Sequence, residues 1–343
     1  MPYLARLVFT LTSGAIGGAV FWLLSLPLPW MLGSMCVVAA LAIGGSPVVS
    51  AKRTRPPLAA VIGVTMGSAF SPEITSQASS WIALTVATVV STLVMGLFGV
   101  LYLKRFAGFD LITSYFASMP AGIYEMTHQG GLLGGDERRI ALIQAVRIFL
   151  IVLLIPIAFR YFFDLGASLP DAKGEVGILG FQDATLLALC AIVGWPAAKL
   201  LRFPNPPVLG PLIASAIVHG VGLTETAPPY ELVSLAQVVL GASVGGQFIG
   251  ASIKEIRGTA VHGLLLIPMM IGICVLVSVV AGSVSEIDFP TLMLSLAPGG
   301  IAEMSLIAFA LHAEVAAVVT HQILRVLMVH GLATTVFKII RHT

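Results

Sequence analysis

Apolar segments separated by short polar loops run along almost the whole chain. A helix that crosses the hydrocarbon core of a bilayer needs about 20 apolar residues, so the pattern predicts ten transmembrane helices, five in each half. In the first half they cover Leu7–Leu26, Pro29–Gly45, Pro57–Phe70, Trp81–Leu103 and Ile140–Arg160. In the second half they cover Asp183–Ala198, Pro206–Val221, Glu231–Phe248, Ala260–Gly282 and Val315–Val336.

A shorter piece lies between the last two predicted helices of each half. It reads FDLITSYFASMPAGIYEMTHQGG at residues 109–131 and FPTLMLSLAPGGIAEMSLIAFALH at residues 289–312. Each has an apolar arm, a break of proline and glycine, and a second arm. An arm of about ten residues covers about 15 Å, half of a core of about 30 Å. The pattern fits either a re-entrant hairpin or one broken crossing helix.

The distribution of positive charge favours hairpins. Lys and Arg prefer cytoplasmic loops, and with Arg6 inside, two hairpins place all the basic loops in the cytoplasm. Two crossing pieces would instead put Lys199, Arg202, Lys254 and Arg257 outside. We therefore expect the two halves to have opposite orientations and both termini to be cytoplasmic.

The two halves are copies of one another. PAGIYEM at 120–126 matches PGGIAEM at 298–304 with an offset of 178, and the same offset pairs Gln144 with Gln322 and Arg147 with Arg325. PWMLGSM (29–35) matches PPVLGPL (206–212), which we expect to start helices, and VTMGSA (64–69) resembles VVLGAS (238–243), whose glycines should allow close helix packing.

The predicted fold is therefore an all-α polytopic membrane protein of two inverted repeats, each with about five transmembrane helices and one re-entrant or broken-helix hairpin. We expect a first repeat at 1–165, a linker at 166–182 and a second repeat at 183–343.

The motifs PWMLGSM, MPAGIYEM, NPPVLGPL and APGGIAEM resemble the AbrB-like membrane protein family, also labelled a membrane AbrB duplication or ammonia monooxygenase family. The resemblance covers nearly the whole chain and implies a bacterial inner-membrane protein. Its labels imply either a gene regulator or an ammonia-oxidising enzyme, and neither comes with a catalytic residue set that can be carried over.

Composition narrows these classes. Hydrophobic residues make up 57% of the chain and charged residues 10%, against about 25% charged in soluble proteins. The net charge of +2 comes from scattered loops, so we expect a lipid bilayer and no nucleic acid as partner. Three cysteines inside apolar segments and seven scattered histidines give no ligand cluster, so we expect no metal, no cofactor and no enzymatic activity.

Two glutamates are the main candidates for function. A charge near the bilayer centre costs at least about 2.5 kcal/mol, so Glu125 and Glu303 should face protein or a water-filled cavity. Their nearest predicted partners are Arg147 and Arg325. The pairs are either structural ion pairs or parts of a substrate site where the two repeats meet.

Three features favour a site. Gln144 and Arg147 share one helix face, as do Gln322 and Arg325. Pro120 and Pro298 are expected in the first turn of each second arm, where free amide groups attract anions. The predicted substrate-binding set is Pro120, Gly122, Glu125, Gln144 and Arg147 in the first repeat, and Pro298, Gly299, Gly300, Glu303, Gln322 and Arg325 in the second.

His128 and His321 lie close to the same motifs and are either proton relays or hydrogen-bonded packing residues.

The leading functional hypothesis is a secondary transporter of a small solute coupled to H⁺ or Na⁺. The two arginines and the two helix N-termini would suit an anionic group on that solute. The alternative is a membrane-embedded sensor or regulator of gene expression that binds without transport. Homo-oligomerisation is left open.

Overall fold

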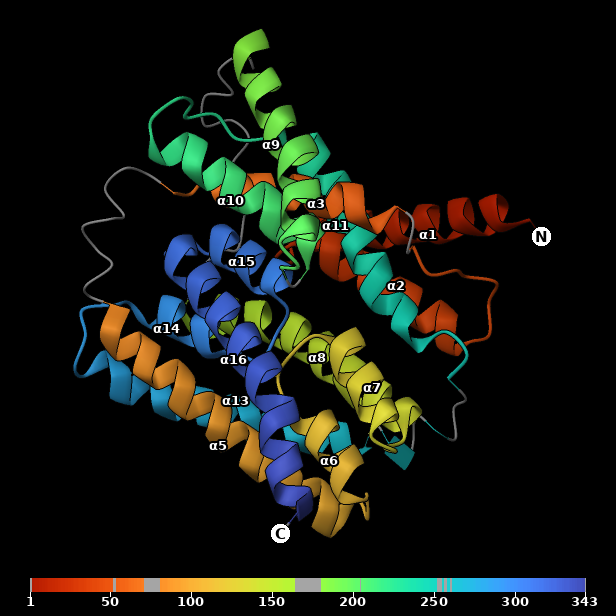
Figure 1. Cartoon of the computed structure of the whole chain (residues 1–343). Helices are drawn as coiled ribbons and strands as arrows, with labels where there is room; N and C mark the ends of the chain where they lie inside the picture. Colours follow the sequence, from red (N-terminus) through yellow and green to blue (C-terminus); the bar gives the residue numbers. More distant parts are fainter. Residues whose placement is uncertain are drawn as a thin grey trace. The chain divides into compact units, whose positions relative to one another are not determined.

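The computed structural model describes residues 2–51, 54–70, 81–163, 180–203, 205–251, 255, 258–259 and 261–342, except for the side chains of Tyr124 and residues 332–342. Within these ranges the long regular elements are fourteen α-helices, with one short 3₁₀ turn and no strand (Figure 1). The predicted all-α class is confirmed for this part of the chain.

A helix occurs at each predicted transmembrane segment. The first half contains α1 (Tyr3–Leu23), α2 (Pro29–Ile43), α3 (Arg55–Gly67), α5 (Ile82–Phe106), α6 (Leu111–Ser118), α7 (Ile123–Leu132) and α8 (Glu137–Phe163). The second half contains α9 (Phe181–Leu200), α10 (Pro206–Gly220), α11 (Tyr230–Gly245), η2 (Gly246–Phe248), α13 (Val261–Gly282), α14 (Phe289–Leu296), α15 (Ile301–Ala310) and α16 (Val315–His342).

The helices differ in length more than the apolar pattern predicts. Five of them, α1, α5, α8, α9 and α13, are long and apolar enough to cross a membrane. Helices α2, α3, α10 and α11 have 13 to 16 residues, which is about 20–24 Å against a core of about 30 Å. Loop residues at their ends extend the apolar windows beyond the helices themselves.

Contacts between the helices divide the chain into two compact units. Unit 1 comprises Met1–Ser79, Leu153–Gly250 and Ser305–Ala316, and unit 2 comprises Ser80–Val152, Ala251–Met304 and Ala317–Thr343. Both units draw on both halves of the sequence. The division falls inside α8, α15 and α16.

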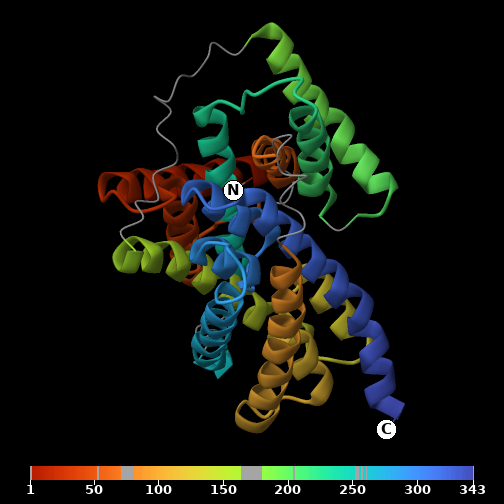
Figure 2. The ribbon, with the colours of Figure 1, turned by 90° about the vertical axis from the view of Figure 1, so that its left-hand side faces the viewer.

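Unit 1 contains two glycine-mediated helix pairs. A Cβ atom added to Gly33 on α2 would lie 2.1 Å from the carbonyl oxygen of Gly17 on α1. One added to Gly210 on α10 would lie 2.1 Å from that of Gly194 on α9. Helices α9 and α10 can be followed side by side in both views (Figures 1 and 2). Only glycine permits this backbone approach.

Within unit 1, helices from the first half of the sequence also pack against helices from the second half. A Cβ on Gly63 of α3 would lie 2.4 Å from the carbonyl oxygen of Val208 on α10, and one on Gly241 of α11 would lie 2.2 Å from that of Met31 on α2. The predicted close packing is confirmed, because a Cβ on Gly67, the glycine of VTMGSA, would also lie 2.6 Å from the carbonyl oxygen of Leu212 on α10. By these contacts Gly63 is the structural equivalent of Gly241. The alignment of VTMGSA with VVLGAS had instead made Gly67 the equivalent of Gly241, one helical turn away.

The PWMLGSM and PPVLGPL motifs start helices, as predicted. Pro29 and Pro206 are the first residues of α2 and α10, and each follows a residue in the left-handed region, Leu28 at φ 45° and Asn205 at φ 47°. Proline suits a first helical position because it has no amide hydrogen to leave unbonded.

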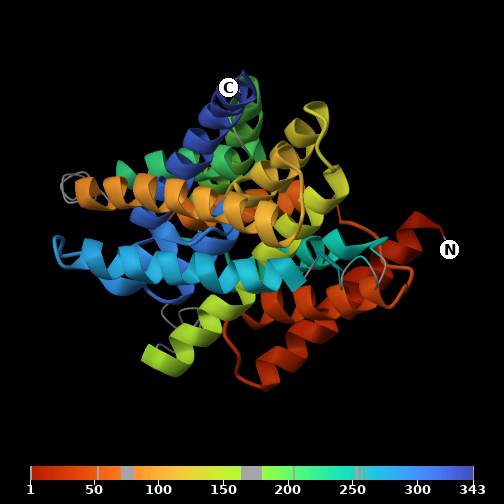
Figure 3. The same cartoon turned by 90° about the horizontal axis from the view of Figure 1, so that it is seen from below.

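Unit 2 is built on α5 and α13, which lie side by side (Figure 3). Each is followed by a pair of short helices, α6 and α7 in the first half and α14 and α15 in the second. Helix α6 packs on α5 and α14 packs on α13. The sequence motifs with glutamate lie in these pairs.

Candidate functional site

Each pair of short helices begins with the same capping interaction. The carboxylate of Asp110 accepts a hydrogen bond from the amide of Thr113 at 2.9 Å, and that of Asp288 accepts one from the amide of Thr291 at 3.0 Å. An Asp N-cap satisfies an amide that has no partner within the helix. The Asp-x-x-Thr spacing recurs at an offset of 178, a signal that the sequence analysis missed.

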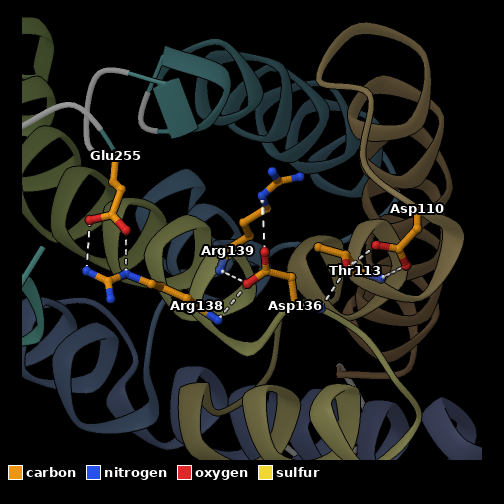
Figure 4. Close-up of polar contacts among 6 residues, drawn as sticks. All are labelled: Asp110, Thr113, Asp136, Arg138, Arg139 and Glu255. Carbon is orange, nitrogen blue, oxygen red and sulfur yellow. Dashed lines mark hydrogen bonds and ion pairs between the residues drawn. The ribbon is translucent and has the colours of Figure 1, made fainter. Parts of the chain in front are cut away.

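The first pair folds back on itself. The amide of Asp136, just before α8, donates to the hydroxyl of Thr113 in the first turn of α6 at 2.9 Å (Figure 4). The guanidinium of Arg139 lies 5.0 Å from the ring centre of Phe109. The two ends of the segment therefore meet, and it is a helical hairpin rather than a straight broken rod.

Exposed ion pairs surround the base of this hairpin. Arg138 forms a two-point contact with Glu255, with Nε to Oε1 and Nη2 to Oε2 both at 2.8 Å, and Arg139 Nε lies 3.2 Å from Asp136 (Figure 4). Exposed pairs of this kind contribute at most about 1 kcal/mol. Arg138 thus links the start of α8 to the segment that follows α11.

The breaks differ from the sequence prediction. Pro120 and Pro298 do not lie in the first turns of α7 and α15, because α7 begins at Ile123 with Gly122 as its N-cap and α15 begins at Ile301. The prolines occupy tight turns instead. The amide of Ala121 donates to Met119 at 2.9 Å, and the equivalent bond from Gly299 to Ala297 is 2.8 Å. The fixed φ of proline suits the centre of such a three-residue turn.

Gln144 and Arg147 on α8 hold the first break. The amide nitrogen of Gln144 donates to the carbonyl oxygens of Phe116 at 2.8 Å and Met119 at 3.0 Å. Arg147 donates through Nη1 to Met119 at 3.0 Å and through Nη2 to Ala121 at 3.1 Å. The predicted polar helix face therefore bonds to carbonyls at the interruption between α6 and α7, where the regular pairing within the helix ends.

Gln322 and Arg325 on α16 hold the second break in the same way. Gln322 donates to the carbonyl oxygens of Leu294 at 2.7 Å and Ala297 at 3.1 Å. Arg325 donates through Nη1 to Ala297 and through Nη2 to Gly299, the latter at 2.7 Å. Each acceptor is the counterpart, at an offset of 178, of an acceptor in the first repeat.

The structural ion pairs considered from the sequence are not formed. Arg147 and Arg325 are each 1% exposed, and among the described residues ion pairs within 4.0 Å occur only at Arg138 and Arg139. The carbonyls at the break carry the negative end of a helix dipole and attract the guanidinium groups. The electrostatic interaction between Arg147 and Arg325 is repulsive.

The two glutamates lie at the start of the second helices. Both are in the first turn, Glu125 on α7 and Glu303 on α15. A Cβ added to Gly122 would lie 2.0 Å from Oε2 of Glu125, and one added to Gly300 would lie 2.0 Å from Oε2 of Glu303. The glycines leave room for the carboxylates, which a helix N-terminus stabilises.

An open cleft of about 500 Å³ adjoins the first glutamate. It is lined by Glu125, His128, Gln129 and His330. The structure therefore brings the predicted residues Glu125 and His128 together. The sequence analysis missed His330 because its counterpart in the first repeat is Val152, so the duplication gave no signal there.

His321 lies in a buried environment, 1% exposed. Its Nδ1 must donate to the carbonyl oxygen of Ala317, 2.7 Å away, so Nε2 can accept from the hydroxyl of Thr85 at 3.1 Å. This arrangement fits the packing alternative, and the relay role stays a prediction. Among the described residues no three His, Cys, Asp or Glu side chains gather as a metal site.

Comparisons with known proteins identify a family and two relatives. The family model described as "Transition state regulatory protein AbrB" matches residues 30–341. The chain is 26% identical to "Uncharacterized protein YhjN" of Bacillus subtilis (strain 168), covering 96% of this chain and 91% of that protein. It is 24% identical to "Putative regulator AbrB" of Escherichia coli (strain K12), covering 74% of this chain and 72% of that protein.

Proposed function

The chain belongs to the AbrB family, and from this membership and its buried arginines we propose that it is a secondary transporter of a small anionic solute. The solute crosses the bacterial inner membrane together with H⁺ or Na⁺. The proposal assigns the protein no enzymatic step, no resident cofactor and no nucleic-acid partner.

The observation that carries the proposal is the position of the two arginines. Arg147 lies ten residues into α8 and Arg325 ten residues into α16, which is about 15 Å along each helix axis or half of a hydrocarbon core. Both hold broken helices at that depth. Charged residues at membrane depth are costly and usually mark a substrate or ion pathway.

The repeats supply a route for alternating access. Transporters with inverted repeats place substrate and coupling-ion sites near the midplane, where broken helices of the two repeats meet. The equivalent contacts of Arg147 and Arg325 support the same arrangement here. We propose opposite orientations for the two repeats and a cytoplasmic location for both termini, as the distribution of Lys and Arg favours.

The glutamates are the proposed coupling residues. Glu125 reaches from the N-terminus of α7 into the open cleft, where a proton or Na⁺ has access to it. His128 in the same cleft would relay the proton. Glu303 is 5% exposed and would bind its cation only when unit 2 rearranges.

Transport in proteoliposomes tests the proposal. Currents and uptake are measured with succinate, glutarate, acetate and sulfate as probes, under imposed H⁺ or Na⁺ gradients. We expect one or more probes to be carried, with loss of uptake in Arg147→Gln and Arg325→Gln. Arg138→Gln, which removes an exposed arginine, serves as the matched control. Wild-type protein that binds these anions but moves none of them would sink the proposal.

A membrane-embedded regulator is the second candidate. The names printed for the family model and for the Escherichia coli relative describe regulators. Binding of an anion without transport, together with capture of a specific cytoplasmic partner, would favour this function.

A further inference from the structure

Arg147 and Arg325, which we call the paired arginine site, carry a buried charge that no carboxylate among the described residues compensates. Arg147 and Arg325 are each 1% exposed, and neither forms an ion pair with a described carboxylate within 4.0 Å. Their mutual interaction is repulsive. Backbone carbonyls supply dipoles and no net charge, so the formal charge of the pair remains +2.

Each guanidinium also has one N–H donor, at Nε, without a hydrogen-bond acceptor among the described residues. The Nη groups of Arg147 and Arg325 bond to the carbonyls of the two breaks. The Nε–H of each is buried and has no hydrogen-bond partner among the described residues. A buried donor without a partner costs about 1–3 kcal/mol. Both of these Nε donors belong to positively charged guanidinium groups.

An anion at this site would compensate both the charge and the donors. A monoanion leaves one positive charge uncompensated, whereas a dianion cancels both, and the difference is large where water is excluded. We infer that Arg147 and Arg325 together bind a divalent anion with negatively charged oxygens, one charge for each arginine. This inference rests on the proposed function and names the substrate class of the same site.

Two chemical classes meet this description: dicarboxylates, whose charges lie on separate groups, and compact divalent oxyanions such as sulfate. The two arginines come from separate repeats. Binding that improves with the spacing of two carboxylates would identify the first class, and selective binding of sulfate the second.

Calorimetric titration of purified full-length protein tests the inference. The probes are succinate, glutarate and sulfate as dianions and acetate, propionate and monomethyl succinate as monoanions, at pH 7.5 and constant ionic strength. We expect at least one dianion to bind at least about tenfold tighter than any monoanion. Equal binding of both classes, or no binding at all, would overturn the inference.

Single substitutions make the test independent of folding losses. Arg147→Gln and Arg325→Gln each lower the buried charge to +1, so the dianion-to-monoanion preference should fall by about tenfold or reverse. Arg147→Lys keeps the charge and should keep the preference even if the variant is less stable. Arg138→Gln should change nothing. A preference that is unchanged in the Gln variants, or lost equally in Arg138→Gln, contradicts the inference.

Transport assays separate this inference from the proposed function. Dianion selectivity without uptake would support the dianion site and contradict the proposed transport function. Uptake of monoanions without dianion selectivity would do the reverse.

Discussion

Arg147 and Arg325 lie 178 residues apart in the sequence and make the same pair of hydrogen bonds. Each donates to the carbonyl oxygens on either side of a proline, at Met119 and Ala121 for the first and at Ala297 and Gly299 for the second. The duplication has therefore preserved a three-dimensional contact as well as a motif. Because these acceptors are backbone atoms, the contact constrains the break itself.

The glutamine beside each arginine should contribute strongly to stability. We expect Gln144→Leu and Gln322→Leu each to lower the free energy of unfolding by about 1–3 kcal/mol, because each leaves buried carbonyl oxygens with fewer donors. Chemical unfolding in detergent measures the change.

Gln237 provides the control for that experiment. It is also fully buried, but both polar atoms of its side chain have no hydrogen-bond partner among the described residues. Gln237→Leu should be neutral or stabilising. Equal losses for Gln237→Leu and Gln144→Leu would show that bulk rather than hydrogen bonding matters at these positions.

Much of the fold follows from the apolar pattern, because each predicted segment contains a helix. The lengths were less accessible, since the apolar residues around α2, α3, α10 and α11 continue into their loops. The alignment of VTMGSA with VVLGAS was wrong by one helical turn because the glycine pattern is ambiguous. Glycines recur four residues apart in both helices, at Gly63 and Gly67 and at Gly241 and Gly245, so a slip of four still superposes glycine on glycine.

The residues that hold the two breaks were predictable because they are duplicated. The offset identified Gln144, Arg147, Gln322 and Arg325, but sequence alone suggested carboxylate partners for the arginines. Which acceptor a guanidinium reaches depends on carbonyls exposed by the break, and no side-chain pattern encodes these. The counterpart of His330 in the first repeat is Val152, so the duplication did not mark this histidine.

Close packing in unit 1 should tolerate no side chain at Gly33 or Gly210. Gly33→Ala and Gly210→Ala each place a methyl group 2.1 Å from a backbone oxygen, so we expect about 1–3 kcal/mol of destabilisation from overpacking. Gly272→Ala on α13 has nothing within 4 Å and should be neutral or slightly stabilising. Thermal unfolding of the three variants in one detergent compares them, and a loss in Gly272→Ala as large as the others would contradict the packing explanation.

Each glutamate carboxylate lies in a glycine cradle, which is the space that Gly122 or Gly300 leaves by having no Cβ atom. The two cradles should respond differently when the glycine is replaced by alanine. A methyl group on Gly122 displaces the carboxylate of Glu125, which borders the open cleft. One on Gly300 displaces Glu303, which is 5% exposed. We expect Gly300→Ala to cost about 1–3 kcal/mol more than Gly122→Ala, because a displaced carboxylate in a packed interior must push neighbouring atoms aside, whereas one beside an open cleft has room to move.

A double-mutant cycle isolates the cause of that difference. In a Glu303→Ala background, Gly300→Ala should cost little, so the coupling between the two substitutions should account for most of the loss. If Gly300→Ala costs the same with and without the carboxylate, the strain lies in the backbone and the cradle explanation is wrong.

Asp110 should give the stability of the first hairpin a dependence on pH. Burial raises the pKa of its carboxyl, but hydrogen bonds from the hydroxyl and amide of Thr113 outweigh burial and hold the pKa below its usual value. A pKa that is lower in the folded state contributes stability above the unfolded value of about 3.9, and the contribution disappears as the pH falls through the folded value.

Asp110→Ala tests this dependence. At pH 7 the variant should be less stable by about 1 kcal/mol, the usual effect of losing an N-cap. The gap between wild type and variant should close below about pH 4, because the protonated carboxyl is a weaker acceptor. Thr113→Val removes the hydroxyl but keeps the amide bond, so it should retain part of the pH dependence. A gap that stays constant from pH 7 to about pH 3 would mean that the carboxylate charge plays no part in holding the hairpin base.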